Sequence, residues 1–378
     1  MKKYSCTLRL LLVVVGVVLC HHINVVSAAG NDKDEDDLSR VEFLPGFNGR
    51  LPFELFTGYI GVSENEEVQL FYYFIKSESN SKEDPLILWL SGGPGCSSLT
   101  AFMYELGPLE FKVEEYNGSL PTLLLAPHSM SKVANVLFLD QPANTGFSYA
   151  TTPNAARFTD LEACNHVYDF LQKWFTKHPD FKSNPFYVAG DSYAGIVVPI
   201  ISVLISDGNE VANKSVVINL KGYILGNPVT FPAQKNYSIP FAHRMGLVSS
   251  ELYKSIAENC KEEFEFEEMD GMKNDLCSQE LKVFKQMISG INPEHVLEPV
   301  CESQFILLNS GGVKFFNKGT TRSLREKKLN MQWCRGSIEQ WLRCRSIIFP
   351  SAYTVTTRDS RQYHANLSRR GYASLIFR

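Results

Sequence analysis

The stretch FYVAGDSYAGIVVPI, residues 186–200, decides how this sequence is expected to fold. It begins as an apolar strand, breaks at Gly190, presents Ser192 and continues as an apolar helix. A serine at such a sharp turn holds its hydroxyl above the end of a sheet, where the N-terminus of the helix favours developing negative charge. The stretch therefore predicts Ser192 as a nucleophile, and the alternative is a serine that only caps the helix.

Four short apolar segments predict a largely parallel sheet that is covered on both faces. They are PLILWL (85–90), NVLFLD (135–140), PFYVAG (185–190) and KGYILG (221–226). Between the second and the third, TDLEACNHVYDFLQKWF (159–175) has apolar residues at helical spacing, and Thr159 with Glu162 forms a capping box at its start. This alternation predicts a strand–helix–strand crossover. RGYASLIF (370–377) predicts a further strand.

Residues 240–345 have a different character from the segments around them. They contain charged helical segments such as SSELYKSIAENCKEEFEF (249–266), carry Cys260 and Cys277, and lack strong strand patterns. We therefore expect one α/β domain over residues 30–378, with a helical cap inserted at about 240–345 and stapled by a disulfide.

The first 29 residues predict a secretory signal peptide. Basic residues come first, the apolar run LLLVVVGVVL (10–19) follows, and the small residues VSAA (26–29) form a cleavage site near Ala28 or Ala29. The alternative is a membrane anchor, but the apolar run has about half the length that a spanning helix needs. We expect a secreted or vacuolar protein that enters the secretory pathway.

Secretion changes the meaning of the cysteines and of the sequons. Seven cysteines follow the signal peptide and meet an oxidising compartment, namely Cys96, Cys164, Cys260, Cys277, Cys301, Cys334 and Cys344. Cys164 lies on the apolar face of the predicted helix, so we expect a buried free thiol. Asn-x-Ser sequons predict glycosylation sites on exposed loops at Asn117, Asn213, Asn236 and Asn366.

Composition and charge exclude several classes of partner. The chain of 378 residues is 44% hydrophobic and has a net charge of −4, with its basic residues scattered rather than clustered, so no nucleic-acid-binding surface is predicted. No later segment is long enough to span a membrane. No CxxC pair or His/Cys cluster has metal-site spacing, and we expect neither a metal nor another cofactor.

A second stretch, WLSGGPGCSS (89–98), directly follows a buried strand. Paired glycines at this place can turn a backbone N–H toward the nucleophile, as an oxyanion hole requires, although Gly-Gly-Pro-Gly can also form only a tight turn. The occurrence of both stretches in one chain favours a catalytic serine.

With these motifs the chain resembles the serine carboxypeptidase-like proteins, and most closely their plant members. The matching segments are LPGFNGRLPFELFTGYIGV, DPLILWLSGGPGCSS, NVLFLDQPANTGFSYA, FLQKWF, FYVAGDSYAGIVVP, GYILGNPVT, AHRMGLVSSELY and INPEHVLEPVCE. The match covers about residues 40–302 and returns at GSIEQWLRC and YHANLSRRGYASLIF. The resemblance implies an α/β-hydrolase fold with a helical cap, and it implies Ser192 as the nucleophile.

The resemblance also implies roles for residues around Ser192. The N–H groups of Gly93 and Tyr193 would form the oxyanion hole, and disulfides would join Cys96 to Cys344 and Cys260 to Cys277. Two departures from the family pattern stand out. Asn144 replaces a common glycine and is expected to adopt left-handed backbone angles, and residues 303–333 do not resemble the family, which leaves Cys301 to Cys334 as the remaining predicted pair.

Three residues bear on the substrate, which we expect to be a small-molecule acyl ester or a peptide. The family's peptidases hold a terminal carboxylate with an Asn before the paired glycines and a Glu before the nucleophile, and here Ser91, Gly92 and Asp191 occupy this region. Ser lacks the amide donor, and Asp is one methylene shorter. This favours transfer of an acyl group from an activated ester over release of C-terminal amino acids. The sequence predicts no acyl donor, acceptor or oligomeric state.

The base that would activate Ser192 is harder to identify. The family's Asp follows the strand matched by GYASLIF, and its His comes later, so both are expected to be missing from this sequence and the activity to be impaired. Asp359 and His364 have the right order, but they precede the last strand and are expected at its opposite end. His243 and His295 fall in segments unrelated to the triad. The alternative function is a non-catalytic binding protein or a non-functional truncated gene product.

Overall fold

The computed structural model describes residues 40–114, 120–211, 216–231, 238–260, 275–291, 296–297, 342–344 and 352–377. They fall into two compact units, a body that ends at Thr230 and resumes at residues 342–377, and a helical unit between Phe231 and residue 297. The predicted signal peptide, the sequons Asn117, Asn213 and Asn236, the Cys301–Cys334 pair and His295 lie outside the described residues.

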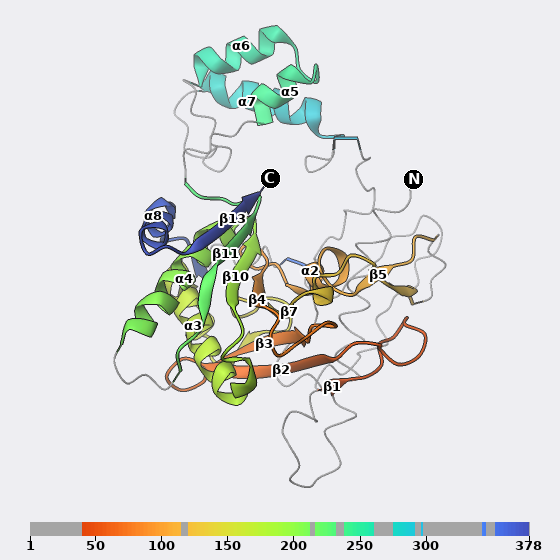
Figure 1. Ribbon diagram of the computed structural model, residues 1–378. Helices are drawn as coiled ribbons and strands as arrows, with labels where there is room; N and C mark the ends of the chain where they lie inside the picture. Colours follow the sequence, from red (N-terminus) through yellow and green to blue (C-terminus); the bar gives the residue numbers. More distant parts are fainter. Residues whose placement is uncertain are drawn as a thin grey trace. The chain divides into compact units, whose positions relative to one another are not determined.

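The body contains a mixed and mostly parallel sheet, which confirms the predicted sheet type (Figure 1). Its strand order is β1-β2-β3-β7-β4-β10-β11-β13, with β8 beside β3. The strands are β1 (Arg40–Val41), β2 (Leu55–Val62), β3 (Val68–Ile75), β4 (Leu86–Leu90), β7 (Asn135–Leu139), β8 (Tyr149–Ala150), β10 (Phe186–Asp191), β11 (Leu220–Gly226) and β13 (Ala373–Phe377). The pairings β1·β2, β2·β3, β3·β7 and β3·β8 are antiparallel, and the pairings from β7 to β13 are parallel.

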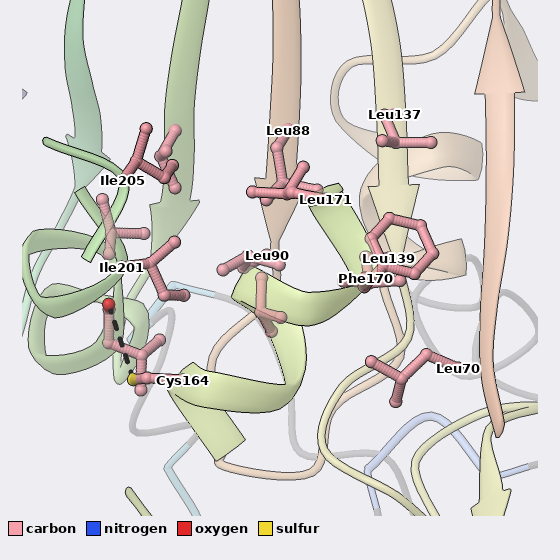
Figure 2. Close-up of a cluster of buried hydrophobic side chains, with 14 of the residues drawn as sticks. Leu70, Leu88, Leu90, Leu137, Leu139, Cys164, Phe170, Leu171, Ile201 and Ile205 are labelled. Carbon is pink, nitrogen blue, oxygen red and sulfur yellow. Dashed lines mark hydrogen bonds between the residues drawn. The ribbon is translucent and has the colours of Figure 1, made fainter. Parts of the chain in front are cut away.

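Both faces of the central strands are covered, as their unbroken apolar sequences predict. Every residue of β4 and β7 is buried. Side chains alternate between the faces, so Leu88 and Leu90 join one core cluster, whereas Ile87 and Trp89 join the other. Figure 2 shows the first cluster, with the leucines of β4 and β7 against the helix that carries Phe170 and Leu171.

Helices α3 (Asp160–Lys177), α4 (Ala194–Glu210) and α8 (Arg361–Arg369) contribute to the first cluster, and α2 (Leu99–Tyr104) contributes to the second. Helix α3 begins with the predicted capping box of Thr159 and Glu162. Cys164 is buried and free, as predicted, and its thiol lies 3.8 Å from the Val197 carbonyl oxygen. Leu161 is 45% exposed, because the buried face of α3 runs through Asp160, Ala163, Cys164 and Val167.

Small elements complete the body. The strands β5 (Leu109–Phe111) and β6 (Leu123–Leu125) form one pair, and β9 (Phe158–Thr159) and β12 (Tyr353–Thr354) form another. The 3₁₀ helices are η2 (Met130–Lys132) and η3 (Pro179–Phe181). The β9·β12 pair places residues 353–357 beside the start of α3, which matters for the site described below.

The helical unit has the helical character that its sequence predicts. It contains α5 (Ser238–Arg244), α6 (Ser250–Asn259) and α7 (Asp275–Ile288), which share a small apolar core. A disulfide joins Cys260 at the end of α6 to Cys277 in α7. The assignment of this unit as a cap inserted at 240–345 stays a prediction. None of the described helices is long and apolar enough to cross a membrane.

Candidate active site

Ser192 lies at a sharp turn between β10 and α4, with a left-handed φ of 55°. Three backbone hydrogen bonds hold this unusual conformation: the Ser192 N–H donates to Gly226 O at 3.0 Å, and its carbonyl accepts from Gly195 N at 3.0 Å and Val229 N at 2.9 Å. The N-cap of α4 is Tyr193 and makes no side-chain capping bond, so Ser192 is not the helix-capping serine of the alternative prediction. The residue is exposed, and its Oγ makes no hydrogen bond within the described residues.

Two glycines allow the backbone to approach this closely. A Cβ atom on Gly190 would lie 2.3 Å from the Leu90 carbonyl oxygen, so the turn needs glycine there, as the sequence predicts. A Cβ on Gly92 would lie 2.7 Å from the Tyr193 nitrogen and 2.8 Å from the Ser192 Cβ. The turn that follows β4 therefore lies directly against the nucleophile turn.

This contact brings the two predicted oxyanion donors to the same place. Gly93, with a φ of 113°, follows Gly92 in the turn, and Tyr193 follows Ser192. Within the described residues, neither the Gly93 N–H nor the Tyr193 N–H has a hydrogen-bond acceptor. Two unpaired N–H groups beside a serine hydroxyl are the arrangement that binds the oxyanion of a tetrahedral intermediate.

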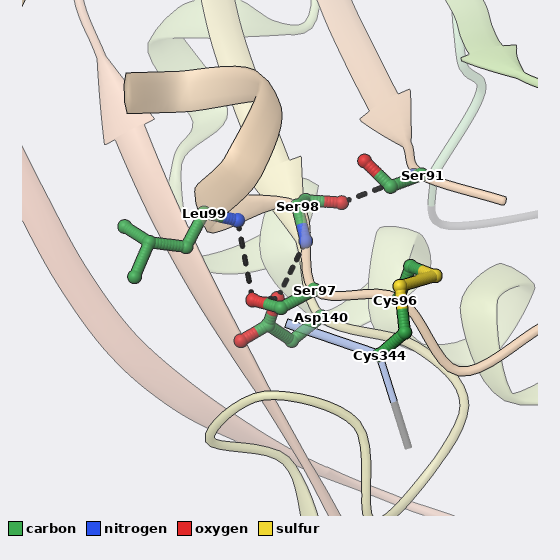
Figure 3. Close-up of a disulfide and its surroundings, with 7 residues drawn as sticks. All are labelled: Ser91, Cys96, Ser97, Ser98, Leu99, Asp140 and Cys344. Carbon is green, nitrogen blue, oxygen red and sulfur yellow. Dashed lines mark hydrogen bonds between the residues drawn. A yellow bond between two sulfur atoms is a disulfide. The ribbon is translucent and has the colours of Figure 1, made fainter. Parts of the chain in front are cut away.

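Asp140 forms hydrogen bonds with Ser97 and Ser98, which follow the Gly93 turn (Figure 3). Its carboxylate is fully buried and accepts hydrogen bonds from Ser97 Oγ at 2.7 Å, Ser98 N at 2.8 Å and Phe147 N at 3.0 Å. Burial raises the pKa of Asp140 to about 6, against the effect of these hydrogen bonds. The loop that follows β7 also contains Asn144, whose φ of 67° confirms the predicted left-handed conformation.

A disulfide joins Cys96 in this turn to Cys344, with an S–S distance of 2.07 Å (Figure 3). The next residue, Ser97, donates its N–H to Arg343 O at 2.8 Å. The turn is thus tied both to the body strand β7 through Asp140 and to the segment 342–344.

The predicted substrate-binding residues lie in the same region. Ser91 is buried, with its N–H bonded to Ser98 Oγ at 3.2 Å, and Gly92 contacts the nucleophile turn. The pKa of Asp191 is raised, first by burial, while a hydrogen bond from the Gly92 N–H and the charge of Arg343 act against the rise. Its Oδ1 is buried and has no partner within the described residues.

Two charged residues that interact with Asp191, Glu105 and Arg343, were not predicted from the sequence. The pKa of Glu105 is raised, first because its carboxyl loses part of its water and then by the negative charge of Asp191, while Arg343 acts in the opposite direction. Two carboxyls and one guanidinium therefore interact electrostatically next to the nucleophile. The available signal was the position of Glu105, a lone charge at the end of the apolar helix that follows the Gly93 turn.

The two substitute residues for the triad are engaged elsewhere. Asp359 is exposed and paired with Arg361, and His364 Nδ1 lies 2.7 Å from the Tyr223 hydroxyl. The expected position of Asp359 was wrong, because α8 runs opposite to the strands and starts at their carboxyl edge, where Ser360 Oγ donates to Gly195 O at 2.9 Å. Neither residue reaches Ser192 through a hydrogen bond.

The remaining predicted residues are in varied settings. His243 belongs to the helical unit, stacks on Tyr253 and lies 3.1 Å from Ser250 Oγ. Asn366 lies inside α8, where it is half-buried and its Oδ1 is buried without a partner among the described residues, rather than on a loop. No group of three His, Cys, Asp or Glu residues in the described parts of the chain has a geometry that could hold a metal ion.

The sequence is similar to known proteins of one family. The sequence pattern of the serine carboxypeptidase family (Peptidase_S10) matches residues 45–378. Serine carboxypeptidase-like 13 of Arabidopsis thaliana is 45% identical over 377 residues, which cover 99% of this chain and 81% of that protein. Serine carboxypeptidase-like 17 of the same plant is 47% identical over 346 residues, which cover 90% of this chain and 76% of that protein.

Among solved structures, a yeast carboxypeptidase has a similar fold. It is Kex1(delta)p, a prohormone-processing carboxypeptidase from Saccharomyces cerevisiae, with a TM-score of 0.59, 21% identity and coverage of 86% of this chain and 73% of that chain. At this identity the likeness establishes the fold alone, which is the α/β-hydrolase fold predicted from the sequence.

Proposed function

Because the chain belongs to the serine carboxypeptidase family, and within it to the plant serine carboxypeptidase-like proteins, we propose that Ser192 forms an acyl-enzyme. The observation that carries the proposal is the left-handed turn at Ser192 with two acceptor-free N–H groups beside it, from Gly93 and Tyr193. Family membership supports a carboxypeptidase or acyltransferase role.

In the first step, Ser192 Oγ attacks the substrate's carbonyl carbon, and the carbonyl oxygen takes the negative charge. The N–H groups of Gly93 and Tyr193 would bind this oxygen. The intermediate then collapses: the bond to the leaving alcohol or amine breaks, that group takes up a proton, and the acyl group stays on Oγ. The Oγ proton passes to a general base, a role for which neither Asp359 nor His364 is placed.

In the second step, a hydroxyl group attacks the acyl-enzyme. Water gives hydrolysis, and the hydroxyl of another molecule gives transfer. We propose transfer as the main outcome, because Ser91 and Asp191 suit the carboxylate of a peptide poorly. The buried Ser91 offers no side-chain amide N–H, and Asp191 is one methylene shorter than the Glu of the family's peptidases.

An assay with two substrates tests this order. The protein is incubated with a 1-O-acyl glucose ester and a hydroxylated acceptor, and separately with an N-blocked dipeptide, and the products are quantified by mass spectrometry. We expect acyl transfer to exceed amino-acid release, and both to vanish in Ser192→Ala. In the double variant Ser91→Asn, Asp191→Glu, peptide release should rise relative to transfer. Efficient peptide release by the unmodified protein, without transfer product, would reverse the order.

A second candidate is binding without catalysis. It is favoured by one observation, that Ser192 Oγ has no hydrogen-bond partner within the described residues. It would apply if the acyl ester bound equally well to the protein and to Ser192→Ala, with no acyl adduct in the protein.

We further propose that the protein enters the secretory pathway, loses residues 1–29 and carries glycans, in the secreted or vacuolar fraction. The basic and apolar N-terminal pattern and the downstream sequons support this. Sequencing of the protein purified from its natural source should give an N-terminus near residue 29 or 30, and deglycosylation should lower its mass. An N-terminus at Met1 with no mass change would contradict both.

A further inference from the structure

The proposed function gives no role to Asp160, a buried carboxylate close to the nucleophile turn. Asp160 is the first residue of α3 and is fully buried. Its Oδ1 accepts hydrogen bonds from the Tyr193 hydroxyl and the Tyr353 hydroxyl, each at 2.6 Å. Its Oδ2 accepts from Thr356 N at 2.5 Å, Thr357 N at 2.8 Å and Thr356 Oγ1 at 3.3 Å.

All five of these donors are neutral, and Asp160 forms no ion pair within the described residues. A buried carboxylate is stable only when hydrogen bonds replace its lost water, so these donors are fixed around it. The phenol pKa of Tyr193 is raised, first by burial and then by its hydrogen bond to Asp160, and the pKa of Tyr353 is raised by burial and by the charges of Tyr193 and Asp160. Both hydroxyls therefore remain donors.

The backbones of Tyr193 and Tyr353 have different roles in the proposed site. Tyr193 follows Ser192 directly, and its N–H is one of the two proposed oxyanion donors. Tyr353 lies in β12, which pairs with β9 next to Asp160, and its backbone is not one of the two proposed oxyanion donors. The Tyr193 side chain thus connects the oxyanion donor at one end to the start of α3 at the other.

We infer that Asp160 is a positioning residue, which fixes the Tyr193 N–H toward the oxyanion by holding the Tyr193 hydroxyl. This inference rests on the proposed function of Ser192. An oxyanion donor acts over a range of only about 2.7–3.1 Å, so a small shift of the Tyr193 backbone weakens the stabilisation of the intermediate. Loss of a whole donor costs about 10²–10³-fold in rate, and a displaced donor is expected to cost less.

The test compares Tyr193→Phe with Tyr353→Phe, which are matched variants. Each removes one hydroxyl at the same distance from the same oxygen, so a purely structural role of Asp160 predicts equal effects. The label is a fluorophosphonate at pH 8.5, and the readouts are the rate of Ser192 modification and the melting temperature. We expect similar losses of melting temperature, about tenfold slower labelling in Tyr193→Phe, and labelling within about twofold of the unmodified protein in Tyr353→Phe. Asp160→Asn should label as slowly as Tyr193→Phe.

Equal labelling rates in the two phenylalanine variants would overturn the inference. If the unmodified protein labels no faster than Ser192→Ala, the proposed function fails, and amide hydrogen exchange of residues 192–196 then decides the positioning role. Faster exchange there in Tyr193→Phe than in Tyr353→Phe supports the role, because the N–H groups of Gly195 and Ile196 bond to the carbonyls of Ser192 and Tyr193. Equal exchange overturns it.

Discussion

The two sides of the proposed oxyanion hole are held in different ways. Tyr193 belongs to the junction of a central strand and a long helix, and its backbone is fixed by the sheet and by α4. Gly93 belongs to a glycine-rich loop, and its position depends on Asp140 and on the Cys96–Cys344 disulfide. The Gly93 N–H therefore depends on side-chain contacts and a disulfide, whereas the Tyr193 N–H is held first by the backbone of strand and helix and then, by our inference, by Asp160 through the Tyr193 hydroxyl.

The largest expected effect is on the loop side. Asp140→Ala removes the buried acceptor of the Ser97 hydroxyl and of the N–H groups of Ser98 and Phe147. We expect a loss of about 3–5 kcal/mol in the free energy of unfolding, measured by urea denaturation, because each orphaned donor costs about 1–3 kcal/mol. Asp140→Asn is the control that keeps volume and one acceptor, and it should lose less. Equal losses in both variants would mean that volume, not hydrogen bonding, matters at this position.

Removal of the Cys96–Cys344 disulfide should have the second largest effect on stability. Replacing Cys96 and Cys344 together by alanine is expected to lower the free energy of unfolding by about 2–5 kcal/mol, since the bond closes a long stretch of chain. Amide hydrogen exchange of residues 92–99 should become faster, whereas that of residues 192–196 should change little.

The matched control is the replacement of Cys260 and Cys277 by alanine. Their disulfide closes a stretch of only 17 residues within the helical unit. This replacement should leave exchange at residues 92–99 unchanged. Equal exchange at 92–99 in both double variants would show that the Cys96–Cys344 bond does not hold the loop.

A change of pH should alter the free energy of unfolding through Asp140 on the loop side, and by a smaller amount. The pKa of Asp140 is raised from 3.8 to about 6 in the folded protein, so between these values the folded state binds more protons than the unfolded state. The contribution of Asp140 to stability is therefore full below about pH 4 and is lost as pH rises through about 6, by about 2–3 kcal/mol. Denaturation at several pH values should show this loss in the unmodified protein and a flatter profile in Asp140→Asn. Identical profiles would contradict the assignment.

The sequence predicted the elements whose patterns are local. The central strands β4, β7, β10 and β11 were found because burial on both faces gives continuous apolar runs, and α3 was found from its periodicity and capping box. The antiparallel strands β2 and β3 were not identified. Residues of intermediate burial interrupt the pattern of β2, whereas β3 was missed although seven of its eight residues are buried. The nucleophile turn and the Gly93 turn were predicted from glycines whose close contacts the structure contains.

Contacts between distant parts of the chain could not be predicted. Glu105 is one of 41 acidic residues, and only the fold brings it near Asp191. Asp160 stands where a solvated acidic residue is common at a helix start, but Tyr353, 193 residues away, helps to bury it. The position of Asp359 was wrong because the direction of α8 depends on the crossover rather than on the local sequence.

The central claim is that Ser192, with the N–H groups of Gly93 and Tyr193, is built to carry an acyl group. The most direct measurement is the rate at which a fluorophosphonate modifies Ser192, compared by peptide mapping with the rates at other exposed serines. Because an oxyanion hole stabilises the charge that develops when Ser192 Oγ attacks, we expect Ser192 to react faster than the other exposed serines, and the labelled peptide to vanish in Ser192→Ala. Modification of Ser192 at the same rate as the other serines would contradict the account.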